Sequence, residues 1–134
     1  MRIVLDTNVI VSALLSPAGP PARVLALVAE ARVSVLLDER VLAEYQRVLE
    51  YRKFGFRPAV REEIFDYLVD FGERVAGPFA AVDLPHRQDA KFLEVAIAGR
   101  ADALVTGNLR HFPVGARQGV RVLSPAEFME EFGR

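Results

Sequence analysis

Three acidic residues stand at positions that ordinary surface charge does not fully explain. Asp6 ends the apolar run IVL, and the chain becomes apolar again directly after Thr7 and Asn8. Glu44 falls on the flank of the apolar stripe of a predicted helix, and Asp89 falls on the apolar face of another. Each position also has a simpler explanation, because acids cap helices, favour their first turns or reach water from a helix flank.

Convergence of Asp6, Glu44 and Asp89 would make a cation site. Each carboxylate raises the cost of ionising the others, and a bound cation would relieve that cost. The chain contains no Cys and only two His, so the ligands on offer are hard oxygens, which suit Mg²⁺ or Mn²⁺ better than Zn²⁺. Ions held by carboxylates also bind phosphate oxygens. These residues therefore predict phosphoryl chemistry, in which one or two ions activate a water and stabilise the leaving oxygen.

Alternating strands and helices are expected to position these acids. Short apolar runs rich in β-branched residues predict strands at 2–6, 33–37, 79–82, 103–106 and 120–123. Apolar residues at helical spacing predict helices at 9–15, 22–31, 39–51, 58–75 and 89–98. Ser124 and Glu127 form a capping-box pattern that opens a last helix. The alternation predicts a parallel sheet with helices on both faces.

The end of the first strand is where such a sheet places a ligand site. Sites in parallel α/β sheets lie beyond the carboxyl ends of the strands, and Asp6, Thr7 and Asn8 stand at that point. A chain of 134 residues can bury a core of its own, so we expect one domain over residues 1–134.

Composition narrows the class of protein. No apolar run approaches the roughly 20 residues of a membrane span, and the first residues lack a signal-peptide pattern. With the absence of Cys, this leads us to expect a cytoplasmic protein with no membrane partner. A net charge of −1 excludes nucleic-acid binding by bulk positive charge, but a local basic rim stays open.

The order and spacing of the motifs resemble the PIN-domain ribonucleases, many of which are VapC-like toxins of toxin–antitoxin pairs. The similar segments are IVLDTNVIVSALL, LLDERVLAEYQRVL, QDAKFLEVAIAGRADALVTGN and LSPAEFMEEF. The first begins at residue 3 and the last ends at residue 132, so the resemblance extends over nearly the whole chain. Asp6, Glu44 and Asp89 stand at the family's first three acidic positions. No single motif is specific, but their order and spacing together are.

The resemblance implies a fold, a reaction and partners. The fold is a three-layer α/β/α arrangement around a parallel sheet of about five strands. The reaction is Mg²⁺- or Mn²⁺-dependent hydrolysis of RNA phosphodiester bonds. The implied site consists of the catalytic and metal-binding acids Asp6, Glu44 and Asp89 and the bracing residues Thr7, Asn8 and Thr106. An antitoxin protein and a homodimer or higher oligomer are the implied partners.

One position departs from the family's pattern. Many relatives carry a fourth acid where this chain has Asn108, or a few residues beyond, near His111. Asn108 is a further candidate metal ligand through its carbonyl, but it brings no charge. Arg87, Lys91, Arg110 and His111 lie near the same predicted edge, and they are either phosphate contacts or ordinary surface charges.

Three other protein classes with acidic residues or a phosphate site on a similar sheet fit the sequence less well, and a fourth alternative stays open. A haloacid-dehalogenase-type phosphatase needs a second Asp where this chain has Asn8, and a phospho-receiver domain needs paired acids on the first strand. A mononucleotide binder needs a glycine-rich phosphate loop, which is absent from the sequence. A non-catalytic PIN-like module that binds RNA or protein stays open, because the fourth acid is missing.

Overall fold

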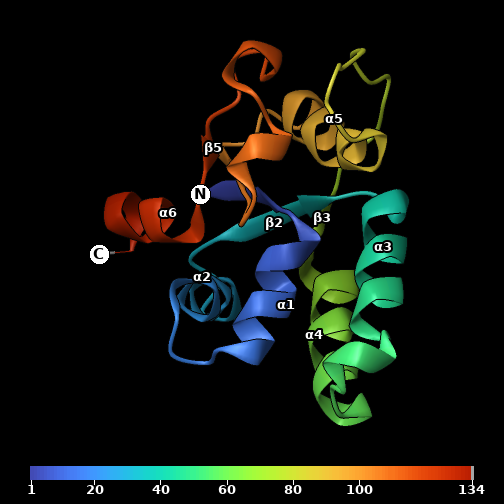
Figure 1. Cartoon of the computed structure of the whole chain (residues 1–134), viewed down its shortest axis with the longest axis vertical. Helices are drawn as coiled ribbons and strands as arrows, with labels where there is room; N and C mark the ends of the chain where they lie inside the picture. Colours follow the sequence, from blue (N-terminus) through green and yellow to red (C-terminus); the bar gives the residue numbers. More distant parts are fainter. Residues whose placement is uncertain (134) are drawn as a thin grey trace.

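The computed structural model describes residues 1–133 as short strands alternating with helices (Figure 1). The strands are β1 (Arg2–Leu5), β2 (Ser34–Leu37), β3 (Glu73–Arg74), β4 (Ala103–Val105) and β5 (Val122–Leu123). The α-helices are α1 (Thr7–Leu15), α2 (Pro20–Ala29), α3 (Glu39–Leu49), α4 (Pro58–Phe71), α5 (Ala90–Ala98) and α6 (Pro125–Phe132). Four 3₁₀ turns complete the regular structure: η1 (Arg52–Phe54), η2 (Arg87–Asp89), η3 (Leu109–His111) and η4 (Val114–Ala116).

All five strands form one parallel sheet in the order β3-β2-β1-β4-β5. Helix α5 covers one face of the sheet, and α1, α2 and α4 lie on the other (Figure 1). The predicted three-layer α/β/α fold with a five-stranded parallel sheet is therefore confirmed. Because β1 is the middle strand, its carboxyl end lies between those of β2 and β4.

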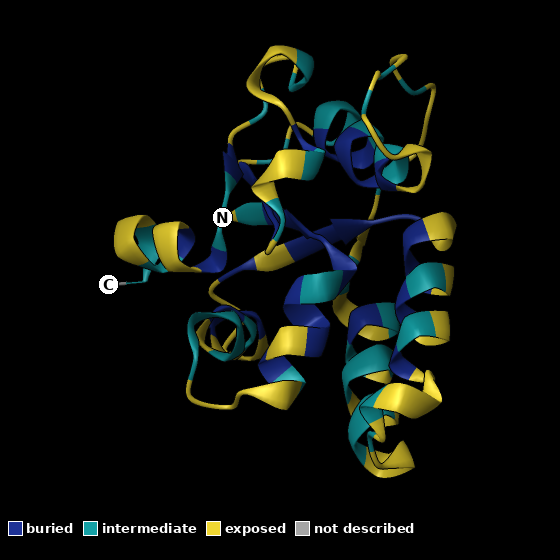
Figure 2. Ribbon diagram, in the orientation of Figure 1, coloured by how far each residue is buried: buried dark blue, intermediate teal, exposed yellow. Residues whose placement is uncertain are grey.

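The centre of the sheet is buried on both faces, as Figure 2 shows. Ile3, Val4 and Leu5 of β1 are fully buried, and so is all of β4. A parallel strand covered by helices on both sides needs apolar residues in every position, which explains these unbroken apolar runs. The rigid middle of the sheet thus carries the residues that follow β1 and β4.

The predicted strand at 79–82 is wrong, and so is the end of the predicted helix at 58–75. Helix α4 ends at Phe71. The strand that replaces the one predicted at 79–82 is β3, which lies within the residues predicted as helix. At Gly72 a Cβ atom would lie 2.5 Å from the Leu68 carbonyl oxygen and 2.6 Å from the Leu37 side chain. Glycine thus lets the chain pass close to β2, where Glu73 pairs with Leu36.

Other boundaries differ by a few residues. Helices α1 and α2 each begin two residues before the predicted start, at Thr7 and Pro20, and β5 begins only at Val122. The predicted capping box is confirmed: the Glu127 N–H donates to Ser124 Oγ at 3.1 Å, and the Ser124 N–H donates to Glu127 Oε1 at 2.8 Å. Among the described residues no single helix could span a membrane; α1 and α2 reach the required length and apolarity only as a pair bent by 105°.

Candidate active site

Asp6 lies where β1 ends and α1 begins, and it is 5% exposed. Its side chain does not cap the helix. The Thr106 hydroxyl, just beyond β4, donates to Asp6 Oδ2 at 2.8 Å, and Asn8 Nδ2 donates to the same oxygen at 3.3 Å. Because β1 and β4 are neighbours in the sheet, residues a hundred positions apart hold this carboxylate in place.

Asn8 joins the ends of the two strands. Its side-chain oxygen accepts a hydrogen bond from the Gly107 N–H at 2.9 Å, while its amide nitrogen donates to Asp6. A Cβ at position 107 would lie 3.3 Å from the Asn8 oxygen, so glycine allows this close approach. The polar side chains of Asp6 and Asn8, which follow β1, thus make tertiary contacts, and Asp6 does not cap α1.

Glu44 reaches the same region from α3. The Thr7 hydroxyl donates to Glu44 Oε2, and the Lys91 ammonium lies 2.6 Å from Oε1. Lys91 also donates to the Gln88 carbonyl oxygen. The Lys91 and Glu44 side chains are only 15% and 12% exposed, so this is a largely buried ion pair. Both oxygens of Glu44 therefore have partners within the chain.

Asp89 ends η2 and directly precedes α5, and it is 7% exposed. His111 Nδ1 lies 2.9 Å from Asp89 Oδ2, but this oxygen is buried without an aligned hydrogen bond. A buried carboxylate oxygen that lacks a donor is costly, because it has lost its water without replacement. A positively charged ligand at this oxygen would therefore stabilise ionised Asp89.

Asn108 and His111 are engaged with each other. The Asn108 amide nitrogen lies 2.8 Å from His111 Nε2, and the Asn108 N–H donates to Thr106 Oγ1 at 3.0 Å. The ring centroids of His86 and His111 lie 4.2 Å apart. The position of the missing fourth acid is therefore occupied by an Asn108–His111 pair whose imidazole ring also contacts Asp89.

Burial and mutual repulsion raise the pKa values of two of the acids, Asp6 and Asp89. The pKa of Asp6 is raised from 3.8 to about 6. Burial is the main cause, the charges of Asp89 and Glu44 add to it, and the Thr106 hydrogen bond opposes it. Burial also raises the pKa of Asp89, while the neighbouring His111 opposes the shift. The two acids are thus held in an environment that favours a proton or another cation.

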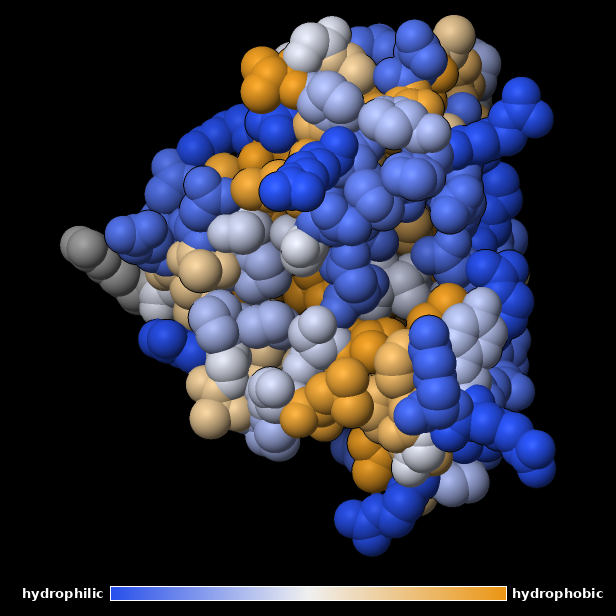
Figure 3. All heavy atoms as spheres, in the orientation of Figure 1, coloured by the Kyte–Doolittle hydropathy of each residue, from blue (hydrophilic) through white to orange (hydrophobic). Residues whose placement is uncertain are grey.

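The three acids line one open cleft of about 340 Å³. Its walls also include Arg47, Tyr51, Lys53 and Phe54, together with Thr7, Asn8, Val11, Val48 and Gln88. The cleft opens between α1 and α3, and on the face shown in Figure 3 apolar and charged side chains lie side by side over these helices. Convergence of Asp6, Glu44 and Asp89 on one space is the central feature of the site.

The donor set suits a divalent cation, although the acids do not yet surround one. Within residues 1–133 no group of three or more His, Asp or Glu side chains is placed closely enough to hold a metal ion together. Lys91 pairs with Glu44, whereas the buried Asp89 Oδ2 has only the His111 ring nitrogen close by and no basic side chain pairs with Asp6 among the described residues. The residues fit Mg²⁺ or Mn²⁺ in their chemistry, with Lys91 acting as an internal counter-ion.

The four predicted substrate contacts divide into two pairs. Arg87 and Arg110 are exposed, on the same turns, η2 and η3, as Asp89 and His111. Lys91 and His111 instead contact Glu44 and Asp89. The sequence pattern placed all four residues near one edge but did not reveal that two of them face the acids.

Sequence reasoning also missed two basic residues of the cleft, Arg47 and Lys53. Arg47 could have been found, because it stands three residues after Glu44 on a helix and so shares its face. Lys53 gave no signal, because its position depends on the turn of the chain after α3. On the inner side of α3, Tyr45 is fully buried, and its hydroxyl donates to the Leu5 carbonyl oxygen at 2.6 Å.

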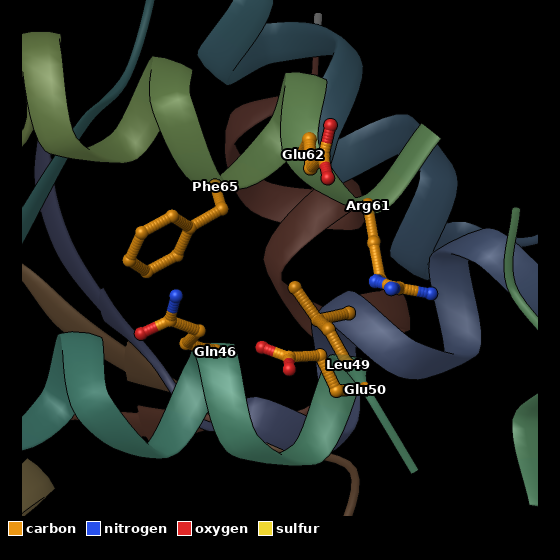
Figure 4. A pocket seen from close by; sticks show the side chains of 6 residues that line it. All are labelled: Gln46, Leu49, Glu50, Arg61, Glu62 and Phe65. Atoms are coloured by element: carbon orange, nitrogen blue, oxygen red, sulfur yellow. The ribbon is translucent and has the colours of Figure 1, made fainter. Parts of the chain in front are cut away.

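A second hollow lies on the opposite side of α3. Figure 4 shows its lining between α3 and α4: Gln46, Leu49, Glu50, Arg61, Glu62 and Phe65. It holds about 140 Å³ and contains none of the residues described above. This hollow is a space between two packed helices, and the chemistry lies on the other face of α3.

Comparison with known families agrees with this geometry. A model of the PIN domain matches residues 2–110, which include β1 to β4 and all three acids of the cleft. A search of curated proteins finds no match to the chain.

Proposed function

The chain belongs to the PIN-domain family, and we propose that it is a metal-dependent ribonuclease that hydrolyses RNA phosphodiester bonds. PIN domains are generally metal-dependent nucleases that bind RNA. The observation that carries the proposal is the convergence of Asp6, Glu44 and Asp89, from three separate segments, on one open cleft. The raised pKa values of Asp6 and Asp89 support it, because both carboxyl groups gain from a nearby cation.

Asp6 and Asp89 would hold the ion, with Glu44 as the third ligand once Lys91 releases it. A bound Mg²⁺ or Mn²⁺ would supply an activated water and charge neutralisation at the phosphate. Thr106 and Asn8 fix the orientation of Asp6, and Thr7 fixes that of Glu44. Asn108 stays a proposed additional ligand, for which its amide must turn away from His111.

The exposed Arg87 and Arg110 would bind phosphates beside the cut bond. They flank Asp89 and the end of β4 respectively, so they provide positive charge at the rim of an acidic cleft. Such contacts position the strand without reading its sequence.

Replacement of Asp6 by Asn tests the activity. Asp6→Asn should reduce Mn²⁺-dependent cleavage of single-stranded RNA by more than about 100-fold, since loss of even an outer-shell partner of a metal ligand costs 10- to 100-fold. Asp66→Asn, the same change on the exposed surface of α4, should cleave like the wild type. Cleavage that persists in Asp6→Asn and in chelator would show that the proposal is wrong.

We also propose that the protein is the toxin of a toxin–antitoxin pair and acts on RNA in the cytoplasm. The support is the resemblance of the motifs to VapC-like proteins. Expression of the chain alone should stop growth, and co-expression of a small protein encoded by a neighbouring gene should restore it. Asp6→Asn should not stop growth.

A non-catalytic RNA- or protein-binding module is the second candidate. Two observations favour it: Asn108 brings no charge to the fourth position, and Lys91 already neutralises Glu44. This candidate predicts that the wild type binds single-stranded RNA but leaves it intact in Mn²⁺.

A further inference from the structure

Three aromatic rings stack in a row directly after α3. The rings of Tyr51 and Phe54 lie 6.2 Å apart with 19° between their planes, and those of Phe54 and Phe56 lie 5.5 Å apart with 17°. Gly55 ends η1 with φ of 61°, a backbone conformation that glycine adopts easily, and this turn brings Phe56 back beside Phe54. We call Tyr51, Lys53, Phe54 and Phe56 the aromatic platform.

The platform stays open to solvent. Tyr51 is 40% exposed, and neither Phe54 nor Phe56 is buried. Aromatic rings contribute most to stability when they are fully buried, so this row, with Tyr51 exposed and Phe54 and Phe56 half-buried, leaves part of that contribution unused. Phe56 packs against the hydrophobic core at one end of the row, whereas Tyr51 and Phe54 present an apolar surface to the cleft.

Positive charge accompanies the rings. The Lys53 ammonium lies 5.9 Å from the Tyr51 ring centroid and 5.3 Å from that of Phe54, and within residues 1–133 it pairs with no carboxylate. The Arg47 side chain is 64% exposed, and its ion pair with Glu44 spans a long 3.9 Å. Both cations are therefore available to an anionic ligand.

The platform and the acids share one cleft. Tyr51, Lys53 and Phe54 line the same open space as Asp6 and Asp89. The volume of about 340 Å³ lies at the lower end of the range for small-ligand sites. A phosphate held at the acids would thus place the adjoining part of its strand over the platform.

Single-stranded RNA matches this combination best. Its unpaired bases stack on aromatic side chains, and its phosphates pair with lysine and arginine. The acids alone would repel a polyanion, so cations on one side of them supply the charge complementarity that a strand needs. A protein partner would explain the rings but not why Lys53 and the exposed Arg47 lie with them beside the three acids.

We propose that the aromatic platform, with Arg47, is a nucleotide subsite that stacks an unpaired base of a single-stranded RNA next to the phosphate at the acids. This inference rests on the proposed ribonuclease function and names how that site holds its substrate. Tyr51 and Phe54 supply the stacking surface, while Lys53 and Arg47 contact the flanking phosphates.

Binding, measured separately from cleavage, tests the subsite. The probe is a fluorescein-labelled single-stranded oligoribonucleotide of about ten nucleotides, within the usual range of single-strand site sizes. Anisotropy is recorded with the Asp6→Asn protein in chelator. Tyr51→Leu and Phe54→Leu should each weaken binding by about 5- to 100-fold, the range expected for one stacked base.

Matched variants separate stacking from general damage. Tyr51→Phe keeps the ring and should bind like the parent, whereas Phe71→Leu, at a residue 68% exposed on α4, should have no effect. Lys53→Met should reduce the slope of the logarithm of the binding constant against the logarithm of the salt concentration by about 1, which corresponds to the loss of one phosphate contact. If Phe54→Leu does not fold, the comparison of Tyr51→Leu with Tyr51→Phe, at an exposed residue, is sufficient to test the subsite.

The outcomes distinguish this inference from the proposed activity. Reduced binding in Tyr51→Leu but not in Tyr51→Phe supports the subsite even if the wild type never cleaves RNA. Equal binding by Tyr51→Leu and its parent overturns the subsite, even if Mn²⁺-dependent cleavage is found. An equal loss in Phe71→Leu also overturns it, because the effect would then not depend on the platform.

Discussion

Each acid in the cleft depends on a partner that the sequence does not place beside it. Their apolar surroundings marked Asp6, Glu44 and Asp89 as unusual, and the structure brings all three to one cleft. The pairing of Lys91 with Glu44, and of His111 with Asp89, could not be predicted. Periodicity fixes the face on which a residue stands, whereas these contacts depend on where separate elements meet.

The raised pKa of Asp6 predicts how stability depends on pH in the metal-free protein. A carboxyl group with a pKa of about 6 in the folded state and 3.8 unfolded binds its proton more tightly when folded. Its contribution to stability is therefore greatest below about pH 4 and is lost as pH rises through about 6, by up to about 3 kcal/mol. Asp6→Asn should not lose stability in this way as the pH rises, because an amide does not ionise.

Urea denaturation in chelator measures the effect. The free energy of unfolding of Asp6→Asn relative to wild type should rise between about pH 4 and about pH 7. Asp66→Asn, an exposed control, should show a difference that does not change with pH. A difference that stays constant for Asp6→Asn would contradict the predicted burial of its charge.

The elements that strong periodicity marks were predictable, and those that depend on tertiary fit were not. Apolar runs correctly indicated β1, β2 and β4, and the Ser124–Glu127 pattern correctly opened α6. Strand β3 has only two residues, both exposed, so no apolar pattern marks it. Residues 79–82 look strand-like, yet Phe79 instead lies under the Arg40 guanidinium, 4.5 Å from it.

Gly72 is the residue on which the end of α4 depends. Gly72→Ala should destabilise the fold by about 1–3 kcal/mol, because the new methyl group overlaps the Leu68 carbonyl oxygen and the Leu37 side chain. Gly115→Ala is the matched control, since a Cβ there meets nothing within 4 Å. The free energy of unfolding in urea compares them, and equal values would disprove the close packing of β3 against β2.

At the scale of the whole molecule, the sheet order assembles the site. The acids come from the end of β1, from α3 after β2, and from η2. The bracing residues come from the start of α1 and from the end of β4. With β1 in the middle, the residues that follow β1, β2 and β4 gather at one edge of the sheet. Carboxylates so gathered raise each other's pKa, and the folded state therefore carries an electrostatic cost that a cation can remove.

A cation that binds only the folded chain must stabilise it. At a concentration 100 times its dissociation constant, Mn²⁺ should add about 2.7 kcal/mol, which corresponds to an increase in Tm of roughly 5–15 °C for a chain of this size. Lys91→Met should lower the Tm in chelator, because Glu44 loses its counter-ion. The increase with Mn²⁺ should then exceed that of the wild type, since the ammonium no longer competes for Glu44.

Lys53→Met is the control for this competition, since the chain's other lysine lines the cleft without an ion pair to the described carboxylates. Its Tm should rise with Mn²⁺ by the wild-type amount. Thermal denaturation followed by circular dichroism, with and without Mn²⁺, compares the three proteins. A smaller increase for Lys91→Met than for wild type would mean that the ammonium assists the ion instead of standing in for it, and Glu44 would then not be a ligand.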